Sequence, residues 1–476
     1  MTTLAPAPRF SDAINWLNCA PQRLEALRGR VVVLGFWHAG SAASLNLLDD
    51  LAVLQQRHSD GLVAVAIHTP KFDAEKDGEA AIRIAAQASA KVAVANDPGF
   101  VTWQHYGIRA WPSVAVIDTE GNLTDIFAGD RLREPLEARV AQLLDQAAEH
   151  GRRAYLPPPS LARPQLFPML GYPAGILATS QHLYIADTGR HRILECNLEG
   201  RVLREFGSGT PGWVDGSSGI AGFRFPRGLC LVKDTLYVAD GGNHAVRRIR
   251  LTSGDVDTLL GNGTARQPEA VDNATRTRTT LHSPFGVAAS VEKLYVAMTG
   301  EHQIWELDLV RHGWKLLAGS GRAGMVDGAG KAASFAEPVG LALVQSTLYL
   351  ADSANSALRS VHVGTGQVQT LVGQGPFEFG YRDGPRETAQ LQYPLGLAHH
   401  SGQPVLWVAD TCNNQIRQLR LGGGELGTLN ITGATLVRPS ALAATPEALW
   451  VANTGAHEIL KIATDTGAAQ RLSLSE

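Results

Sequence analysis

Two serines near the start of the chain have a spacing that suggests chemistry. Ser41 and Ser44 stand in the pentapeptide Gly40-Ser41-Ala42-Ala43-Ser44, which follows the apolar run that ends at Trp37. A nucleophilic serine needs a histidine and an acid to activate it, and this segment is not the G-x-S-x-G turn of serine hydrolases. A serine that begins a helix accepts a backbone N–H instead. We therefore predict that Ser41 caps a helix and that Ser44 lies in its first turn.

Two histidines accompany this segment in the sequence. His38 is predicted to be a solvated loop residue rather than a catalytic base. His68 ends a second apolar run, so it either lines a peptide groove or simply terminates a strand, and we favour the second interpretation. His68 and Trp111 nevertheless remain candidates for an interaction surface.

The four cysteines are Cys19, Cys196, Cys230 and Cys412. They lie far apart and form no C-x-x-C pair, so a local disulfide-exchange motif is absent from the sequence. The first 15 residues have no basic segment followed by an apolar run, which predicts that no secretory signal is present. We expect reduced, mostly buried thiols in a cytoplasmic protein.

Aspartates and histidines recur at long, similar intervals. The aspartates are Asp187, Asp240, Asp352 and Asp410, and the histidines are His191, His244, His302 and His457. A metal site needs several such side chains to converge, whereas residues in separate repeats need not do so. We therefore predict structural roles, with each aspartate capping the turn that it begins, and no metal or other cofactor.

These residues belong to a phrase that occurs six times. Leu-Tyr/Trp-aliphatic-Ala begins at Leu183, Leu236, Leu294, Leu348, Leu406 and Leu449, at intervals of 43 to 58 residues. A Pro-x-Gly turn usually precedes the phrase, and two further strands are expected after it. Four short strands per unit indicate a propeller blade, so the sequence predicts an all-β six-bladed β-propeller. Its last blade closes either with residues 470–474 alone or with a strand from 165–168.

Longer inserts separate the blades. They carry the aromatic and apolar residues Trp213, Met325, Phe377 and Tyr381. Such side chains either bind a protein or ligand at loop tips or pack between blades, and the sequence leaves both alternatives open.

The first 150 residues have a different pattern. Apolar runs alternate with amphipathic stretches, which indicates an α/β layer fold with a mainly parallel sheet. Expected strands are 31–37, 62–67, 114–118 and 123–127, and expected helices are 44–58, 77–89, 98–106 and 133–150. Three successive prolines from Pro157 then indicate an extended spacer. We predict an α/β domain over 1–150, a Pro-rich linker over 151–165 and the propeller over 166–476.

The first domain resembles thioredoxin-like proteins. Phe36-Trp37 stands where that family carries Trp-Cys-x-x-Cys, and Tyr106 to Ser113 is similar to its segment with a cis proline. The resemblance implies that Pro112 is cis and faces the redox motif, whose two cysteine positions fall on Ser41 and Ser44. A serine hydroxyl cannot form the mixed disulfide. The resemblance therefore implies a degenerate redox motif comprising Trp37, Gly40, Ser41, Ser44 and Pro112.

The repeats resemble the NHL repeat, most clearly in 236–247 and 406–417. A thioredoxin-like domain joined to an NHL propeller is similar to the NHL repeat-containing protein 2 family, here as a bacterial member without the redox cysteines. The family carries a cysteine-rich motif where this chain has residues 40–44.

Charge excludes some partners. Residues 160–476 contain 27 Lys and Arg against 27 Asp and Glu, and residues 1–150 contain 13 against 18. Nucleic acids and anionic membranes are bound through clustered positive charge, so neither is expected as a partner.

Three functional hypotheses follow. The first is a non-catalytic binding or scaffold protein whose redox-silent cleft binds protein or peptide and whose propeller offers a second interaction surface. The second is a metal-dependent hydrolase or lyase acting on a small molecule in the propeller mouth. The third is thiol-redox chemistry through one of the scattered cysteines. The sequence favours the first and identifies no catalytic residue.

Overall fold

The structure of the protein is a computed structural model. It describes residues 5–76, 78–87, 92–155, 158–162, 169–265 and 280–475. The chain divides into two compact units, Met1–Leu166 and Phe167–Glu476, and each is described by itself. Part of the expected linker and the segment 165–168 lie outside the described residues.

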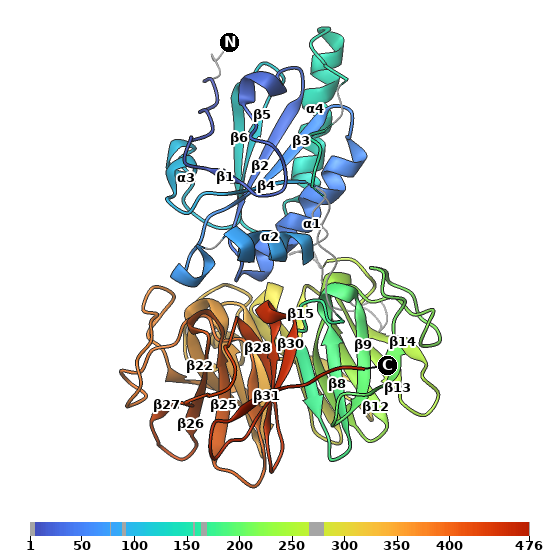
Figure 1. The fold of residues 1–476 in the computed structure, drawn as a ribbon, viewed down its shortest axis with the longest axis vertical. Helices are drawn as coiled ribbons and strands as arrows, with labels where there is room; N and C mark the ends of the chain where they lie inside the picture. The colour runs from blue at the N-terminus through green and yellow to red at the C-terminus, as the bar shows by residue number, and fades with distance from the viewer. Residues whose placement is uncertain are drawn as a thin grey trace. The chain divides into compact units, whose positions relative to one another are not determined.

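The N-terminal unit is built on a six-stranded sheet (Figure 1). The strand order is β1-β4-β3-β2-β5-β6. The strands are β1 Asn15–Trp16, β2 Val31–Trp37, β3 Leu62–His68, β4 Ala93–Asn96, β5 Ser113–Ile117 and β6 Leu123–Ala128. Strands β2, β3 and β4 are parallel, but β1, β5 and β6 pair antiparallel with their neighbours. The mainly parallel sheet that we expected is therefore a mixed one, because the last two strands form a hairpin on the edge.

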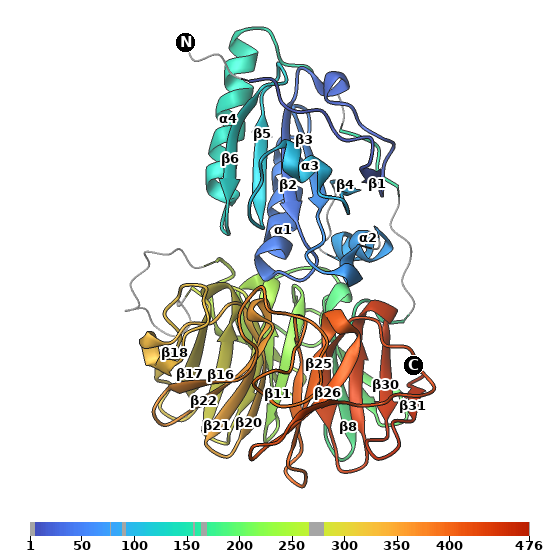
Figure 2. The ribbon, with the colours of Figure 1, turned by 90° about the vertical axis from the view of Figure 1, so that its left-hand side faces the viewer.

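Helices cover one face of this sheet, and a short helix with the N-terminal segment covers the other (Figure 2). The helices are α1 Ala42–Arg57, α2 Gly78–Gln87, α3 Val101–His105 and α4 Arg133–Glu149. Leucines of α1 and α4 pack on one face, whereas Tyr106, Ile108 and Ile14 pack on the other. Every residue of β2 and β3 is buried, which explains why these strands read as continuous apolar runs.

The C-terminal unit is a propeller of six antiparallel sheets, which confirms the predicted architecture. The first two blades contain β7 Gly175–Ala178, β8 His182–Asp187, β9 Arg192–Asn197, β10 Val202–Phe206, β11 Pro226–Val232, β12 Thr235–Asp240, β13 Ala245–Arg250 and β14 Val256–Leu260. The next two contain β15 Pro284–Ala289, β16 Lys293–Met298, β17 Gln303–Asp308, β18 Trp314–Ala318, β20 Pro338–Val344, β21 Thr347–Asp352, β22 Ala357–His362 and β23 Gln367–Val372, with β19 Gly328–Ala329 on the edge of β23. The last two contain β24 Leu397–His399, β25 Val405–Asp410, β26 Gln415–Arg420, β27 Leu426–Thr428, β28 Pro439–Ala444, β29 Leu449–Asn453, β30 Glu458–Ile462 and β31 Ala469–Arg471.

The repeated glycine of the Pro-x-Gly turn lets adjacent blades approach closely. A Cβ added to Gly175 would lie 1.8 Å from the carbonyl oxygen of Arg227 in the next blade. A Cβ on Gly286 would lie 1.8 Å from the carbonyl oxygen of Val339. The repeat therefore needs glycine at these positions because a neighbouring strand occupies the space of a side chain.

The C-terminal segment joins the sixth blade to the first. The sixth blade takes its outer strand, β31, from the C-terminal segment. Beyond it, the N–H of Ser475 donates to the oxygen of Gly200, and Ser475 accepts from the N–H of Val202, on the outer edge of the first blade. Side chains of the first and sixth blades also form one apolar cluster around Trp450 and Leu183. The C-terminal strand therefore contributes to closure, whereas residues 165–168, the other strand considered, lie outside the described residues.

Candidate functional site

The two serines hold the loop between β2 and α1. Ser41 is the N-cap of α1, and its hydroxyl accepts the backbone N–H of Ser44 at 3.3 Å. The Ser44 hydroxyl is fully buried and accepts the N–H of His38 at 3.3 Å. The prediction that Ser41 caps the helix is confirmed. The two hydroxyls thus bind the backbone of their own loop, which is a structural use of both side chains.

The cis proline lies at the same end of the sheet as this loop. The Trp111–Pro112 bond is cis, as the resemblance implied. Strand β5 begins at the next residue, Ser113, which pairs with Phe36 of β2. Trp37, the loop that follows it and Pro112 therefore occupy neighbouring strand ends. Trp111 donates its indole N–H to the Thr69 hydroxyl at 2.8 Å and is half-buried.

His38 is not the solvated residue that we predicted. Its side chain is buried, and its Nδ1 lies 3.5 Å from a carboxylate oxygen of Glu75, which is fully buried. The N–H of Gly40 donates to the same Nδ1 at 3.2 Å. Glu75 comes from a short 3₁₀ turn after β3, so only the tertiary fold brings it to His38. The imidazole ring also packs edge-on against Trp111, with centroids 5.3 Å apart.

His68 has no exposed area, so it does not contribute to an interaction surface. It is the last residue of β3, as the alternative interpretation predicted. Its Nδ1 is 2.8 Å from the side-chain oxygen of Asn96, and its ring packs on Trp37 at 4.8 Å. Trp37 is likewise fully buried. Of the two residues in this region that we predicted for an interaction surface, Trp111 is half-buried and His68 is fully buried.

The cysteines are poorly suited to thiol exchange. Cys19 is half-buried, and Cys196, Cys230 and Cys412 are buried. Burial raises the pKa of Cys19 to about 11 and that of Cys196 to about 12. Burial also raises the pKa of Cys230. Because the thiolate is the nucleophile, thiols with raised pKa values react slowly near neutral pH.

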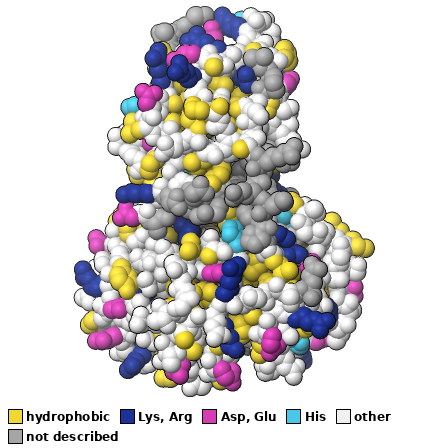
Figure 3. All heavy atoms as spheres, viewed as in Figure 1, with side chains coloured by type: hydrophobic (Ala, Val, Ile, Leu, Met, Phe, Trp, Pro, Cys, Tyr) yellow, Lys and Arg dark blue, Asp and Glu magenta, His cyan; other side chains and the backbone are white. Residues whose placement is uncertain are grey.

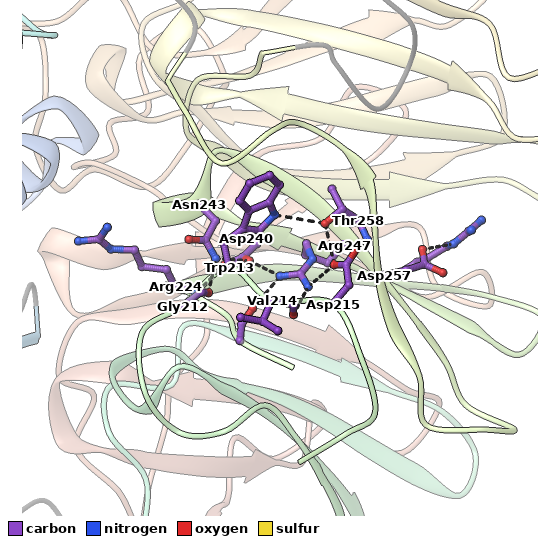
Figure 4. Close-up of polar contacts among 12 residues, drawn as sticks. Gly212, Trp213, Val214, Asp215, Arg224, Asp240, Asn243, Arg247, Asp257 and Thr258 are labelled. Atoms are coloured by element: carbon purple, nitrogen blue, oxygen red, sulfur yellow. Dashed lines mark hydrogen bonds and ion pairs between the residues drawn. The ribbon is translucent and has the colours of Figure 1, made fainter. Parts of the chain in front are cut away.

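The repeated aspartates do not cap the turns that they begin. Each accepts a backbone N–H from the segment before the first strand of its own blade, at 2.6 to 2.7 Å; the donors are Gly171, Arg224, Ala336 and Gln392. In three blades the same aspartate also binds a fully buried arginine seven residues later. Figure 4 shows this for Asp240 and Arg247, whose Nη1 lies 3.1 Å from the carboxylate.

In each of these three blades, the buried arginine connects the recurring aspartate to an aspartate in the insert that precedes the blade. Nη2 of Arg247 reaches Asp215 in the preceding insert at 2.8 Å (Figure 4). Arg359 with Asp327 and Arg417 with Asp383 repeat this contact. Our sequence interpretation missed these networks. An arginine seven residues after the aspartate, combined with an Asp in the insert, was the pattern that could have revealed them.

The repeated histidines join neighbouring blades. Nδ1 of His191 accepts the N–H of Phe225 at 3.2 Å, and His244, His302 and His457 accept N–H groups of the following blade in the same way. Where the repeat has Ser356 or Asn414, the side-chain oxygen makes the equivalent bond. Burial, with a smaller contribution from Arg224, lowers the pKa of His191 to about 4, which keeps it neutral and able to accept.

The four insert residues are exposed to different degrees. Trp213 donates to the Thr258 hydroxyl at 3.2 Å, and the hydroxyl of Tyr381 donates to Thr428 at 3.2 Å, so both rings lie on their own blade while remaining 45% and 56% exposed. Phe377 is 85% exposed, whereas Met325 is half-buried. On the propeller face in Figure 3, charges of both signs are interspersed.

Metal sites and membrane spans were both considered for the described residues. No three His, Cys, Asp or Glu side chains within them are grouped as a metal site would require. Among the helices in that part of the chain, none combines the length and the apolar character of a membrane span.

The sequence is similar to several known proteins. A model of the NHL repeat matches residues 223–249. The chain is 32% identical to protein SUPPRESSOR OF QUENCHING 1, chloroplastic, of Arabidopsis thaliana, over 95% of this chain and 46% of that protein. It is 30% identical to NHL repeat-containing protein 2 of Bos taurus, over 96% of this chain and 70% of the bovine protein. The chain belongs to the NHL repeat-containing protein 2 family. It thus spans less than half the length of its plant relative.

Membership of the NHL repeat-containing protein 2 family agrees with both units. A solved thioredoxin-like protein in its oxidized form is 22% identical to this chain, with a TM-score of 0.29, over 31% of this chain and 99% of that one. The N-terminal unit is a thioredoxin-like domain and the C-terminal unit a six-bladed propeller, as the sequence predicted.

Proposed function

We propose that the thioredoxin-like domain binds an extended polypeptide segment without thiol chemistry, and that the propeller serves as a second interaction platform. The observation that carries this proposal is the use of both serine hydroxyls to hold the backbone of the β2–α1 loop. Both contacts are made to backbone N–H groups of the same loop. The cysteines are mostly buried, and burial raises the pKa of Cys19, Cys196 and Cys230.

The backbone of Trp111 supports the binding part of the proposal. In the part of the chain that the structure describes, no hydrogen bond is made by the N–H or C=O of this residue. Unpaired backbone groups beside the first residue of a strand can pair with a second, extended chain, as in β-strand addition. The half-buried Trp111 ring provides apolar area beside these groups. A peptide in extended conformation therefore fits this position.

Insulin reduction driven by dithiothreitol tests the proposal. The native chain is compared with Ser41→Cys/Ser44→Cys, which restores a C-x-x-C pair at the start of α1, and with Ser44→Cys alone as the matched control. We expect activity only from the double variant, because reduction needs both an attacking and a resolving thiol. Thermal melts of all three chains establish that they are folded.

Each other outcome contradicts a stated part of the proposal. Activity of the native chain would show that one of its own cysteines exchanges disulfides, and the absence of thiol chemistry would be wrong. Silence of the folded double variant would show that the cleft does not admit a polypeptide disulfide. The binding part would then be wrong.

A further inference from the structure

The central channel of the propeller is lined by one residue from each Pro-x-Gly turn. These six residues are Ala174, Arg227, Phe285, Val339, Leu395 and Ser440. With the glycines and the residues that follow them, they enclose a cavity of about 80 Å³. Arg227 is the one charged side chain among the residues that line it. The wall is otherwise almost entirely apolar or backbone.

Arg227 has no acidic partner within the described residues. Its Nε is shielded from solvent without a hydrogen bond, and no ion pair joins its guanidinium to a carboxylate in that part of the chain. The guanidinium lies over the ring of Phe285, with its carbon 4.3 Å from the ring centroid, and it interacts electrostatically with Tyr393. By contrast, the buried Arg247 binds two carboxylates. Arg227 is half-buried, and a partly desolvated cation without a carboxylate beside it is costly, so its position beside a cavity indicates a place for an anion.

A hydroxyl residue that recurs in the blades is missing beside Arg227 and Phe285. In five blades a hydroxyl donates to the proline carbonyl of the next blade; the donors are Thr188, Thr299, Ser353, Thr411 and Thr454. The second blade has Gly241 at this position. A Cβ there would lie 2.9 Å from Cε1 of Phe285, so the missing side chain makes room for the ring. Gly241 thus seats Phe285, and Phe285 in turn holds Arg227.

We propose that this channel binds a small carboxylate with an aliphatic stem, whose two oxygens pair with Arg227 and whose stem lies against the apolar wall. A guanidinium matches a carboxylate in a two-pronged geometry. A phosphate carries more charge and would call for further donors, but the Ser440 hydroxyl already bonds Thr454 at 2.5 Å. The cavity of about 80 Å³ is small, so it suits a ligand of only a few heavy atoms.

The charge state of the arginine is compatible with this role. Burial lowers the pKa of Arg227 to about 10, which leaves the side chain protonated at neutral pH. A carboxylate seated against the apolar wall would displace water from the guanidinium, which strengthens the pairing of opposite charges.

Calorimetric titration of the full chain with sodium propionate tests the proposal. Propionamide, which has nearly the same shape without the charge, is the matched ligand. Arg227→Met is the test variant, and Arg322→Met, at an exposed insert position, is the matched protein control. We expect propionate to bind the native chain and Arg322→Met equally. Arg227→Met should bind it about 10- to 100-fold more weakly, because a hydrogen-bonded charge is removed.

A second variant removes the seat and keeps the charge. Gly241→Thr restores the repeat hydroxyl but displaces the Phe285 ring, so we expect propionate affinity to fall although Arg227 is present. Melting curves establish that each variant is folded. The same titration with a short peptide that has a free C-terminal carboxylate, and with its amidated form, distinguishes a chain end from a free acid as the source of the carboxylate.

Three results would overturn the proposal. Neither the acid nor the free-ended peptide binds the native chain; propionamide binds as well as propionate; or chloride and phosphate give the same response as propionate. Unchanged affinity in folded Arg227→Met would also exclude Arg227 as the recognising group.

Discussion

The two units of this protein depart from their patterns in opposite ways. In the thioredoxin-like domain, the cis bond before Pro112 agrees with the resemblance, but two hydroxyls that hold a loop stand where the resemblance implies cysteines. In the propeller, residues that recur, such as Asp240 and His191, hold the blades together. The second blade differs from the others, because its residue in the channel wall is the charged Arg227.

The difference teaches how to separate structural from functional residues in a single chain. A domain present once must be compared with other proteins, whereas a repeat contains its own controls. A residue type that recurs at one position in the blades shows what the propeller fold requires there. A blade that departs from this residue type, together with a second change that fits the first, indicates a role other than folding. Gly241 and Phe285 form such a compensating pair.

The largest effect is expected where a recurring network is cut. Arg247→Leu leaves Asp240 buried without its counter-ion, which should lower the free energy of unfolding by about 3 to 5 kcal/mol. The sixth blade has Asn453 and Leu460 at these two positions. Asp240→Asn/Arg247→Leu, which copies that blade, should therefore be more stable than Arg247→Leu alone. Urea titrations measure both, and equal losses would mean that the pairing contributes nothing specific.

A blade-to-blade histidine should make stability depend on pH. His191 has a folded pKa of about 4 against 6.5 for an ordinary histidine, so as pH falls the unfolded chain takes up a proton before the folded one. Stability is therefore lost as pH falls from 6.5 to about 4, by about 3 kcal/mol from this group.

His191→Asn is the variant that isolates this term, since Asn414 makes the same bond in another blade. Compared with the native chain, its urea midpoint should fall less between pH 6.5 and pH 4. Parallel curves for the two chains would show that the His191 imidazole does not titrate differently on unfolding.

The smallest effect is expected at the altered redox motif. Ser41→Ala removes the cap of α1 and should cost about 1 kcal/mol, as N-caps usually do. Ser41→Thr keeps the hydroxyl and should stay near the native value. Thermal melts distinguish the two substitutions. If Ser41→Ala melts at the native temperature, the hydroxyl is not needed for the fold, and a structural role for Ser41 is wrong.

The sequence predicted what depends on local pattern. The six phrases predicted six blades, and the apolar run of 31–37 predicted a buried strand, because both signals lie within a few residues. The burial of His38 could not be predicted, since Glu75 reaches it from another loop. The bond from the N–H of Arg224 to Asp240 was missed for the same reason, because Arg224 lies before β11. Arg247 lies only seven residues after Asp240, so that partner was within reach of a sequence pattern that we did not use.

Each blade consists of one uninterrupted stretch of chain, including the last, whose outer strand is its own. The first and sixth blades are therefore joined by apolar side-chain contacts and by hydrogen bonds, such as the one from the N–H of Tyr172 to His457. A circular permutation that connects the existing ends of the propeller and opens the chain in any inter-blade loop would leave all six sheets whole. The order of the blades along the gene is, in that sense, independent of their order around the ring.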